Sequence, residues 1–149
     1  MFELGEERYS RRIARQIVAR RKQSQVRTAS ELAEVIRRSV PRNRHDRIDP
    51  ATRSFQALRI AVNEELKWLK VALKRLPECL RPGGRLVVIS FHSLEDRLVK
   101  EVFRDDNRLE VLTKRPIRAS EAETATNPRA RSAKLRAAMR RPSDVETTA

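Results

Sequence analysis

The densest group of polar side chains in this sequence is Ser-Phe-His-Ser-Leu-Glu-Asp-Arg at residues 90–97. It follows the aliphatic run 86–89 and begins a helical pattern, so we expect it where a buried strand passes into a helix. Ligands of open α/β sheets bind beyond the carboxyl ends of the strands. Free amides at a helix N-terminus attract anionic groups. His92 would lie beside such amides, which makes this segment a candidate site.

An alternative interpretation gives the same residues a purely structural role. Ser93 would cap the helix, and Glu95 and Asp96 would be the first-turn acids that the helix dipole favours. His92 is the residue that this alternative explains least.

Two further groups of side chains are basic. Residues 127–136, Asn-Pro-Arg-Ala-Arg-Ser-Ala-Lys-Leu-Arg, combine cations with small hydrogen-bonding side chains, which suits contacts to phosphates. Near the N-terminus, one face of a predicted helix carries side chains that suit an RNA backbone, namely Arg8, Arg11, Arg12 and Arg15. Each group could equally be an ordinary solvated basic surface.

The charge of the chain is concentrated at its two ends. The 149 residues include 34 Lys and Arg against 20 Asp and Glu, a net charge of +14. Residues 1–48 have a net charge of +7, residues 49–106 of +2 and residues 107–149 of +5. Basic surfaces gain affinity for nucleic acids by displacing counterions from phosphates, so the balance favours a polyanionic partner. Alternatively, the many arginines reflect the base composition of the genome and not a binding partner.

Several classes of protein are excluded by composition. Three glycines cannot form a dinucleotide-binding or Walker loop, and one cysteine forms neither an internal disulfide nor a cysteine metal cluster. No other metal-ligand cluster is evident, so we expect no metal. The longest aliphatic run has four residues, and the first seven residues are too acidic for a signal peptide. We therefore expect a cytoplasmic protein that has no contact with a membrane.

The first third of the chain is predicted to be helical. Tyr9, Ile13 and Ile17 recur every four residues, and the pattern ends near residues 22–26. Residues 28–31, Thr-Ala-Ser-Glu, fit a capping box that opens a second helix, which Pro41 ends. Residues 41–48 are predicted to be a basic linker.

A long helix is predicted to follow from Asp49-Pro50, an N-cap followed by proline at the first helical position. Eight apolar residues between Phe55 and Leu80 recur at intervals of three or four and share one face. Pro77 is expected to kink or end this helix. Trp68 and Val71 lie off the apolar face, which predicts burial on more than one side.

The remaining elements predict part of an α/β layered domain. After the turn 81–84, residues 85–90 read as a strand buried on both faces, as in parallel sheets, and a helix begins near Ser93. Residues 109–113 and 134–139 are further candidate strands, residues 119–131 a polar loop, and residues 142–149 a disordered tail. So few strands mean either a mostly helical domain or a sheet of which part is missing, and we favour the second.

Two motifs in this region resemble a known family. The segment 80–86, Leu-Arg-Pro-Gly-Gly-Arg-Leu, is similar to the fifth-strand region of class I S-adenosylmethionine-dependent methyltransferases. The segment 88–97, Val-Ile-Ser-Phe-His-Ser-Leu-Glu-Asp-Arg, resembles the hallmark of the MraW/RsmH family, which methylates the exocyclic N4 of a cytosine in 16S rRNA. Agreement in order and spacing extends to residues 5–15, 50–60 and 127–136.

The resemblance implies a specific fold and domain organisation. It implies an α/β fold, the C-terminal part of a class I (Rossmann-like) methyltransferase domain, preceded by part of a helical insertion domain. Residues 1–48 would belong to the substrate-recognition insertion and residues 49–141 to the methyltransferase domain. The glycine-rich cofactor loop and the first four strands of the family lack counterparts in these residues.

The resemblance also implies roles for individual residues. The cofactor would be S-adenosylmethionine, although no cofactor-binding residue can be named in this chain. His92 would lie near the target base, with Ser93 and Asp96 orienting it. RNA phosphates would be held by Arg8, Arg12, Arg15, Arg129, Arg131 and Lys134. The partner would be 16S rRNA or the small ribosomal subunit, with a companion chain possible for the N-terminal half.

Two other classes of function stay open at this point. One is a non-catalytic rRNA-binding fragment, which would bind RNA in a salt-sensitive manner without methyl transfer. The other is a DNA-binding module, since residues 7–40 could form two helices in a loose helix-turn-helix arrangement. The long connection at residues 22–27 weighs against the second.

Overall fold

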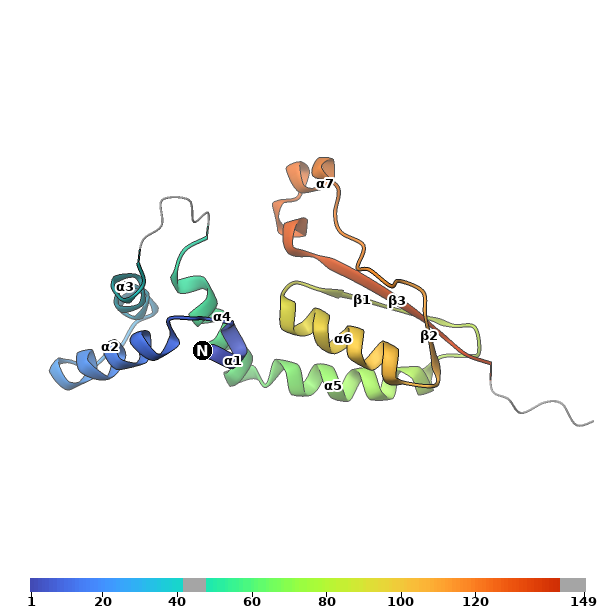
Figure 1. Ribbon diagram of the computed structural model, residues 1–149, viewed down its shortest axis with the longest axis horizontal. Coiled ribbons are helices and arrows are strands. Elements are labelled where there is room, and N and C mark those ends of the chain that lie inside the picture. Colours follow the sequence, from blue (N-terminus) through green and yellow to red (C-terminus); the bar gives the residue numbers. More distant parts are fainter. Residues whose placement is uncertain (42–47, 143–149) are drawn as a thin grey trace, which may run out of the picture. The chain divides into compact units, whose positions relative to one another are not determined.

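The computed structural model describes residues 1–41 and 48–142. The predicted linker 41–48 and tail 142–149 therefore fall almost wholly outside the described residues. The chain divides into two compact units, Met1–Glu65 and Leu66–Ala149. Figure 1 labels their elements. The fold is mixed α/β, mostly helical with one small antiparallel sheet.

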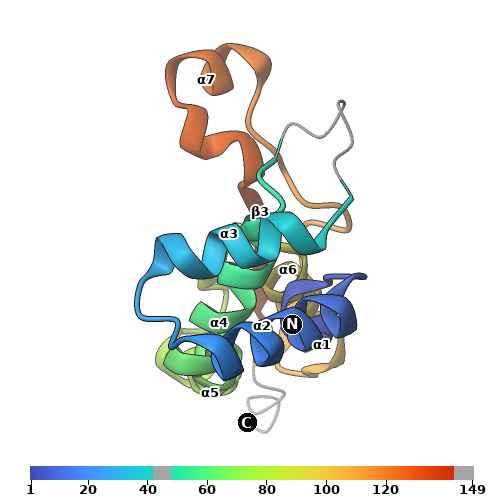
Figure 2. The same cartoon turned by 90° about the vertical axis from the view of Figure 1, so that its left-hand side faces the viewer.

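The described residues of the first unit form four helices, which Figure 2 shows from one end. Ile13, Ala33, Ile36 and Ala51 form its core, and the buried Gly5 packs against Ala57 and the Arg53 carbonyl. Thr28 and Glu31 form the predicted capping box, in which each side chain accepts a backbone hydrogen bond. The helices are α1 (Phe2–Gly5), α2 (Ser10–Gln23), α3 (Ala29–Ser39) and α4 (Ala51–Asn63).

The second unit is a three-stranded sheet with two helices on one face (Figure 1). Its strand order is β1-β3-β2, and both outer strands are antiparallel to β3. Leu73 of α5 and Val99 and Phe103 of α6 form the core with Leu86 and Ala138 of the sheet. The elements are α5 (Glu65–Arg75), of which only the first residue belongs to the first unit, η1 (Leu76–Cys79), β1 (Arg85–Ser90), α6 (Ser93–Asp105), β2 (Leu109–Val111), α7 (Glu121–Thr126), η2 (Pro128–Ser132) and β3 (Lys134–Arg140).

The prediction of one long helix after residue 50 was wrong. Glu64 adopts a left-handed conformation with φ 51°, which separates α4 from α5. Glu65 then accepts hydrogen bonds from Arg59 at 2.8 Å and Asn63 at 3.2 Å, and these contacts stabilise the break. The prediction that this helix is buried on more than one side was also wrong, because Trp68 and Val71 are exposed. Pro77 does end the regular helix, as predicted.

Strand β1 exists as predicted, but its two faces differ. Leu86 and Ser90 are buried, whereas Val87 and Ile89 are 52% and 54% exposed. The prediction of burial on both faces was wrong because α5 and α6 cover the same face of the sheet (Figure 1). The neighbouring strand is antiparallel rather than parallel. Strands β2 and β3 confirm the two further candidates, and the predicted loop 119–131 contains α7 and η2.

Candidate functional site

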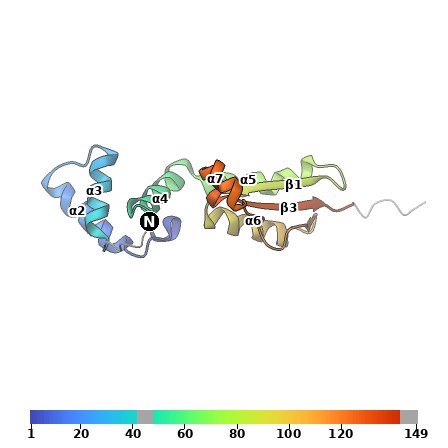
Figure 3. The ribbon, with the colours of Figure 1, turned by 90° about the horizontal axis from the view of Figure 1, so that it is seen from above.

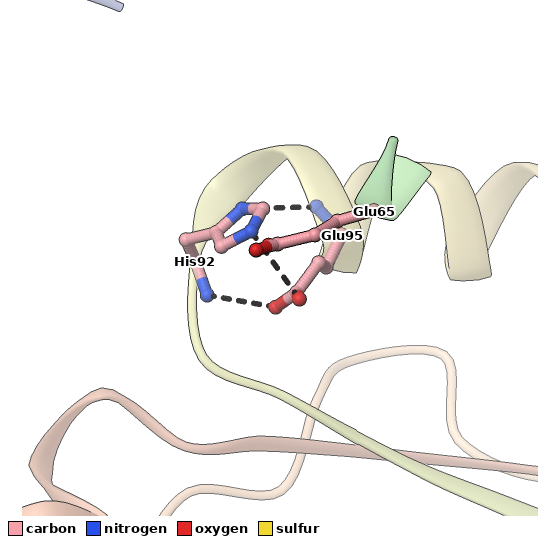
Figure 4. A group of neighbouring side chains, drawn as sticks. All are labelled: Glu65, His92 and Glu95. Carbon is pink, nitrogen blue, oxygen red and sulfur yellow. Dashed lines mark hydrogen bonds and ion pairs between the residues drawn. The ribbon is translucent and has the colours of Figure 1, made fainter. Parts of the chain in front are cut away.

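The candidate site lies where β1 passes into α6, and His92 is the N-cap of that helix. The Glu95 backbone N–H donates to His92 Nδ1 at 3.3 Å. In return, Glu95 Oε2 accepts from the backbone N–H of Phe91 at 2.9 Å and of His92 at 3.3 Å (Figure 4). His92 therefore caps the helix. The purely structural interpretation of this segment had expected Ser93 to be the cap, and on this point it was wrong. Glu65, also drawn in Figure 4, belongs to the first unit.

This cap determines the tautomer of His92. A ring nitrogen that accepts a hydrogen bond carries no proton, so in the neutral ring the proton is on Nε2. Nε2 lies 3.3 Å from Glu95 Oε1 and has no hydrogen-bond partner among the described residues. The side chain is only 8% exposed. His92 thus presents a buried N–H donor whose hydrogen-bonding capacity is unused, and unsatisfied buried donors are uncommon.

Asp96, in the first turn of α6, is held by the neighbouring strand. Its carboxylate accepts hydrogen bonds from Arg136 Nε at 2.7 Å and Nη2 at 3.2 Å. The Asp96 and Arg136 side chains are 14% and 7% exposed. Burial alone would raise the pKa of Asp96, but the hydrogen bond and charge of Arg136, with Lys134, outweigh it and hold that pKa below its ordinary value. Asp96 is therefore an anion engaged by a buried guanidinium.

Sequence reasoning placed Arg136 among the candidate phosphate contacts of residues 127–136, but Arg136 is buried, and its pairing with Asp96 was not predicted. Residues on one face of a strand alternate, and Arg136 shares the buried face of β3 with Ala138. An arginine at an inward position requires a buried partner, and this was the only signal available in the sequence. Ser93, the first residue of α6, is half-buried.

The three predicted RNA contacts near β3 occupy different surroundings. Arg129 and Arg131 lie on η2 and are exposed. The Lys134 Nζ lies 3.7 Å from Asp96 Oδ2, and its side chain is 19% exposed. The structure therefore brings Lys134 together with Asp96 and leaves the two arginines open to solvent.

The arginines of the first unit lie along α2 and just before it. Arg12 and Arg15 are exposed on α2, whereas Ile13 of the same helix is buried. Arg8 stacks over the Tyr9 ring with its guanidinium carbon 4.6 Å from the ring centre, and it donates to the Tyr9 hydroxyl at 2.7 Å. None of the helices within residues 1–41 and 48–142 is long and apolar enough to span a membrane.

Comparison with known proteins gives consistent matches. The chain is 57% identical over 141 residues to ribosomal RNA small subunit methyltransferase H of Rhodopirellula baltica, covering 94% of this chain and 43% of that protein. It is 61% identical over 138 residues to the protein of the same name from Trichormus variabilis, covering 92% and 44%. The chain thus spans less than half the length of these curated relatives. The model of the MraW methylase family matches residues 1–141, and the chain belongs to that family.

Proposed function

We propose that this chain is the C-terminal part of an S-adenosylmethionine-dependent methyltransferase acting on cytosine N4 of 16S rRNA. The observation that carries the proposal is the match to the family over residues 1–141, together with relatives named for methylation of small-subunit ribosomal RNA. In this proposal residues 1–48 are part of the helical insertion and residues 49–141 the C-terminal part of a class I methyltransferase domain. Such an enzyme acts in the cytoplasm, where ribosomes are assembled.

The described residues do not fit a cofactor site of their own. Gly5 is buried against α4, and Gly83 and Gly84 form the turn before β1, so none of the three belongs to a loop that could hold a nucleotide. We therefore assign S-adenosylmethionine binding to polypeptide other than the residues that the structure describes. The chain alone is expected to be inactive.

The contribution of this chain is to hold the target base. The cytosine amine is conjugated with its ring, so it must be aligned and must lose a proton when it is methylated. The base is expected to leave its RNA stack to reach the site. His92 Nε2–H is a donor and not an acceptor, so His92 suits binding a carbonyl oxygen or ring nitrogen of the base rather than taking its proton. Ser93 and Asp96 position the turn that carries His92.

The exposed arginines are proposed to hold the rRNA backbone. Arg129 and Arg131 would contact phosphates beside the site, and Arg8, Arg12 and Arg15 would do so from the first unit. Lys134 would contribute less, since it already lies beside Asp96.

The proposal is tested by measuring transfer of labelled methyl groups from S-adenosylmethionine to 16S rRNA in small subunits. The purified chain is combined with the part of the R. baltica relative that lies outside the match. We expect incorporation with both polypeptides and none with either alone. His92→Ala should reduce incorporation strongly, and turnover at the wild-type rate would refute the role of His92.

A non-catalytic rRNA-binding protein is the second candidate, favoured by the exposed arginines of both units. In that case the chain binds 16S rRNA with an affinity that falls steeply with salt, and the combination of both polypeptides transfers no methyl group. The same experiment therefore distinguishes the two functions.

A further inference from the structure

A groove of about 330 Å³ lies between α5 and α6 in the second unit. The two helices lie side by side and run in the same direction (Figure 3). Three half-buried leucines form the floor of the groove, namely Leu66, Leu94 and Leu98. Leu94 belongs to the first turn of α6, the turn that His92 caps, so one end of the groove lies close to the candidate site. We call this feature the α5–α6 groove.

The rim of the α5–α6 groove is cationic. It is lined by the exposed side chains of Lys67, Lys70, Arg97 and Glu101. Among these four residues the cations exceed the acid by two charges, and they surround an apolar floor. A ligand that matches both features carries negative charge next to an apolar surface of its own.

The one tryptophan of the sequence lies next to this rim. Trp68, on α5, is 58% exposed, and Lys67 Nζ lies 5.3 Å from the centre of its ring. Because Lys67 also lines the α5–α6 groove, the Trp68 ring borders the groove. Unpaired RNA bases stack on aromatic rings and on the planes of arginine guanidinium groups. Trp68 and Arg97 therefore supply stacking surfaces beside the lysines.

We propose that the α5–α6 groove binds single-stranded RNA, with one nucleotide seated between the helices. Its base packs on the leucine floor and stacks on Arg97 or Trp68. Lys67 and Lys70 hold the adjoining phosphates. That this RNA is the strand flanking the target cytosine rests on the proposed function.

The size of the α5–α6 groove favours a nucleotide over an acidic protein segment. Its volume is near the lower end of the range of about 300–1,000 Å³ that is usual for small-ligand sites. An acidic amphipathic helix would need a longer groove, because such a helix inserts side chains from successive turns at i, i+4 and i+7.

The experiment follows the fluorescence of Trp68 while the chain is titrated with a short oligouridylate. The sequence has one tryptophan, so quenching reports the α5–α6 groove, and RNA held only by the arginines of other surfaces leaves the signal unchanged. We expect saturable quenching with an affinity that falls steeply with salt. A polyglutamate peptide of equal charge should not quench. Absence of quenching by RNA, or equal quenching and affinity with polyglutamate, overturns the proposal.

Two variants with exposed substitutions locate the contact without disturbing the fold. Lys70→Gln removes one charge from the rim, so it should weaken binding and reduce the slope of log affinity against log salt by about 0.7, the contribution of one phosphate contact to a single strand. Lys100→Gln is the matched control, since Lys100 is exposed on α6 outside the residues that line the groove. It should leave affinity and slope unchanged. Equal effects of the two variants would overturn the proposal.

These readouts require no methyl transfer, so failure of this RNA site and failure of the proposed enzymatic function are distinguishable. Saturable quenching without methyl transfer by the two-polypeptide mixture would support the site and refute the enzymatic function. Methyl transfer without quenching by RNA would do the reverse.

Discussion

Arg136, in the last strand of the sheet, donates two hydrogen bonds to Asp96, in the first turn of α6. The two residues are 40 positions apart in sequence, and both side chains are largely buried. Because His92 caps the same helical turn, this ion pair fixes the position of the residue that we propose to hold the target base. The C-terminal strand therefore supports the site directly.

Removing the Asp96 charge should destabilise the second unit. Asp96→Asn leaves the Arg136 charge buried without its counter-ion, which we expect to lower the free energy of unfolding by on the order of 3 kcal/mol. Asp105→Asn is the matched control, since Asp105 pairs with Arg104 on an exposed surface. It should change stability by less than about 0.5 kcal/mol. Urea denaturation followed by circular dichroism measures both, and equal effects would contradict the importance of the buried pair.

The stability of the chain should fall in acid because of Asp96. Its pKa in the folded chain lies below the ordinary value of 3.8, since Arg136 and Lys134 outweigh the effect of burial. A lowered pKa stabilises the fold above the unfolded-state pKa, and this contribution is lost as pH falls through the folded-state value. We expect the urea midpoint to decline below about pH 4, with a shallower decline in Asp96→Asn. Identical pH profiles for the wild type and Asp96→Asn would show that Asp96 is not the cause of the loss of stability in acid.

Substitutions of His92 should separate its capping role from its proposed functional role. His92→Ala removes the N-cap acceptor and should cost about 1 kcal/mol of stability. His92→Asn supplies a favourable cap and should retain wild-type stability, but it does not reproduce the Nε2–H donor. Thermal melting and methyl transfer by the two-polypeptide mixture measure the two roles. Full activity in His92→Asn would show that only the cap matters.

Gly5 should be intolerant of any side chain. An added Cβ would meet the Arg53 carbonyl oxygen, a backbone atom of α4 that cannot move without shifting the helix. We expect Gly5→Ala to lower the free energy of unfolding by about 1–3 kcal/mol. Phe2→Ala, on the exposed side of the same helix, should have little effect. An unchanged melting temperature for Gly5→Ala would mean that α1 does not pack on α4 in solution.

Local features of the fold were predictable from sequence where the residues of a short motif are sufficient to form the structure. The spacing of Thr28 and Glu31 was sufficient for a capping box, and the aliphatic run before residue 90 was sufficient for a strand. The break at Glu64 was not predictable, because apolar spacing continues across it and the contacts of Glu65 depend on the folded chain.

The candidate site was only partly predictable. The segment around His92 stood out by its residue types, but its His-x-x-Glu capping box was missed because histidine is not among the preferred N-cap residues. The ion pair of Asp96 with Arg136 depends on how β3 pairs with β1, and no local pattern specifies a partner 40 residues away.

The most direct test of the central claim is the amount of N4-methylcytidine in 16S rRNA of cells that lack their own enzyme. Nucleosides are quantified by mass spectrometry after expression of this chain, of the remaining part of the R. baltica relative, or of both. We predict that the modified nucleoside appears only when both are present and is lost again with His92→Ala. Its absence with both polypeptides well expressed, or its presence with the remaining part alone, would contradict the assignment.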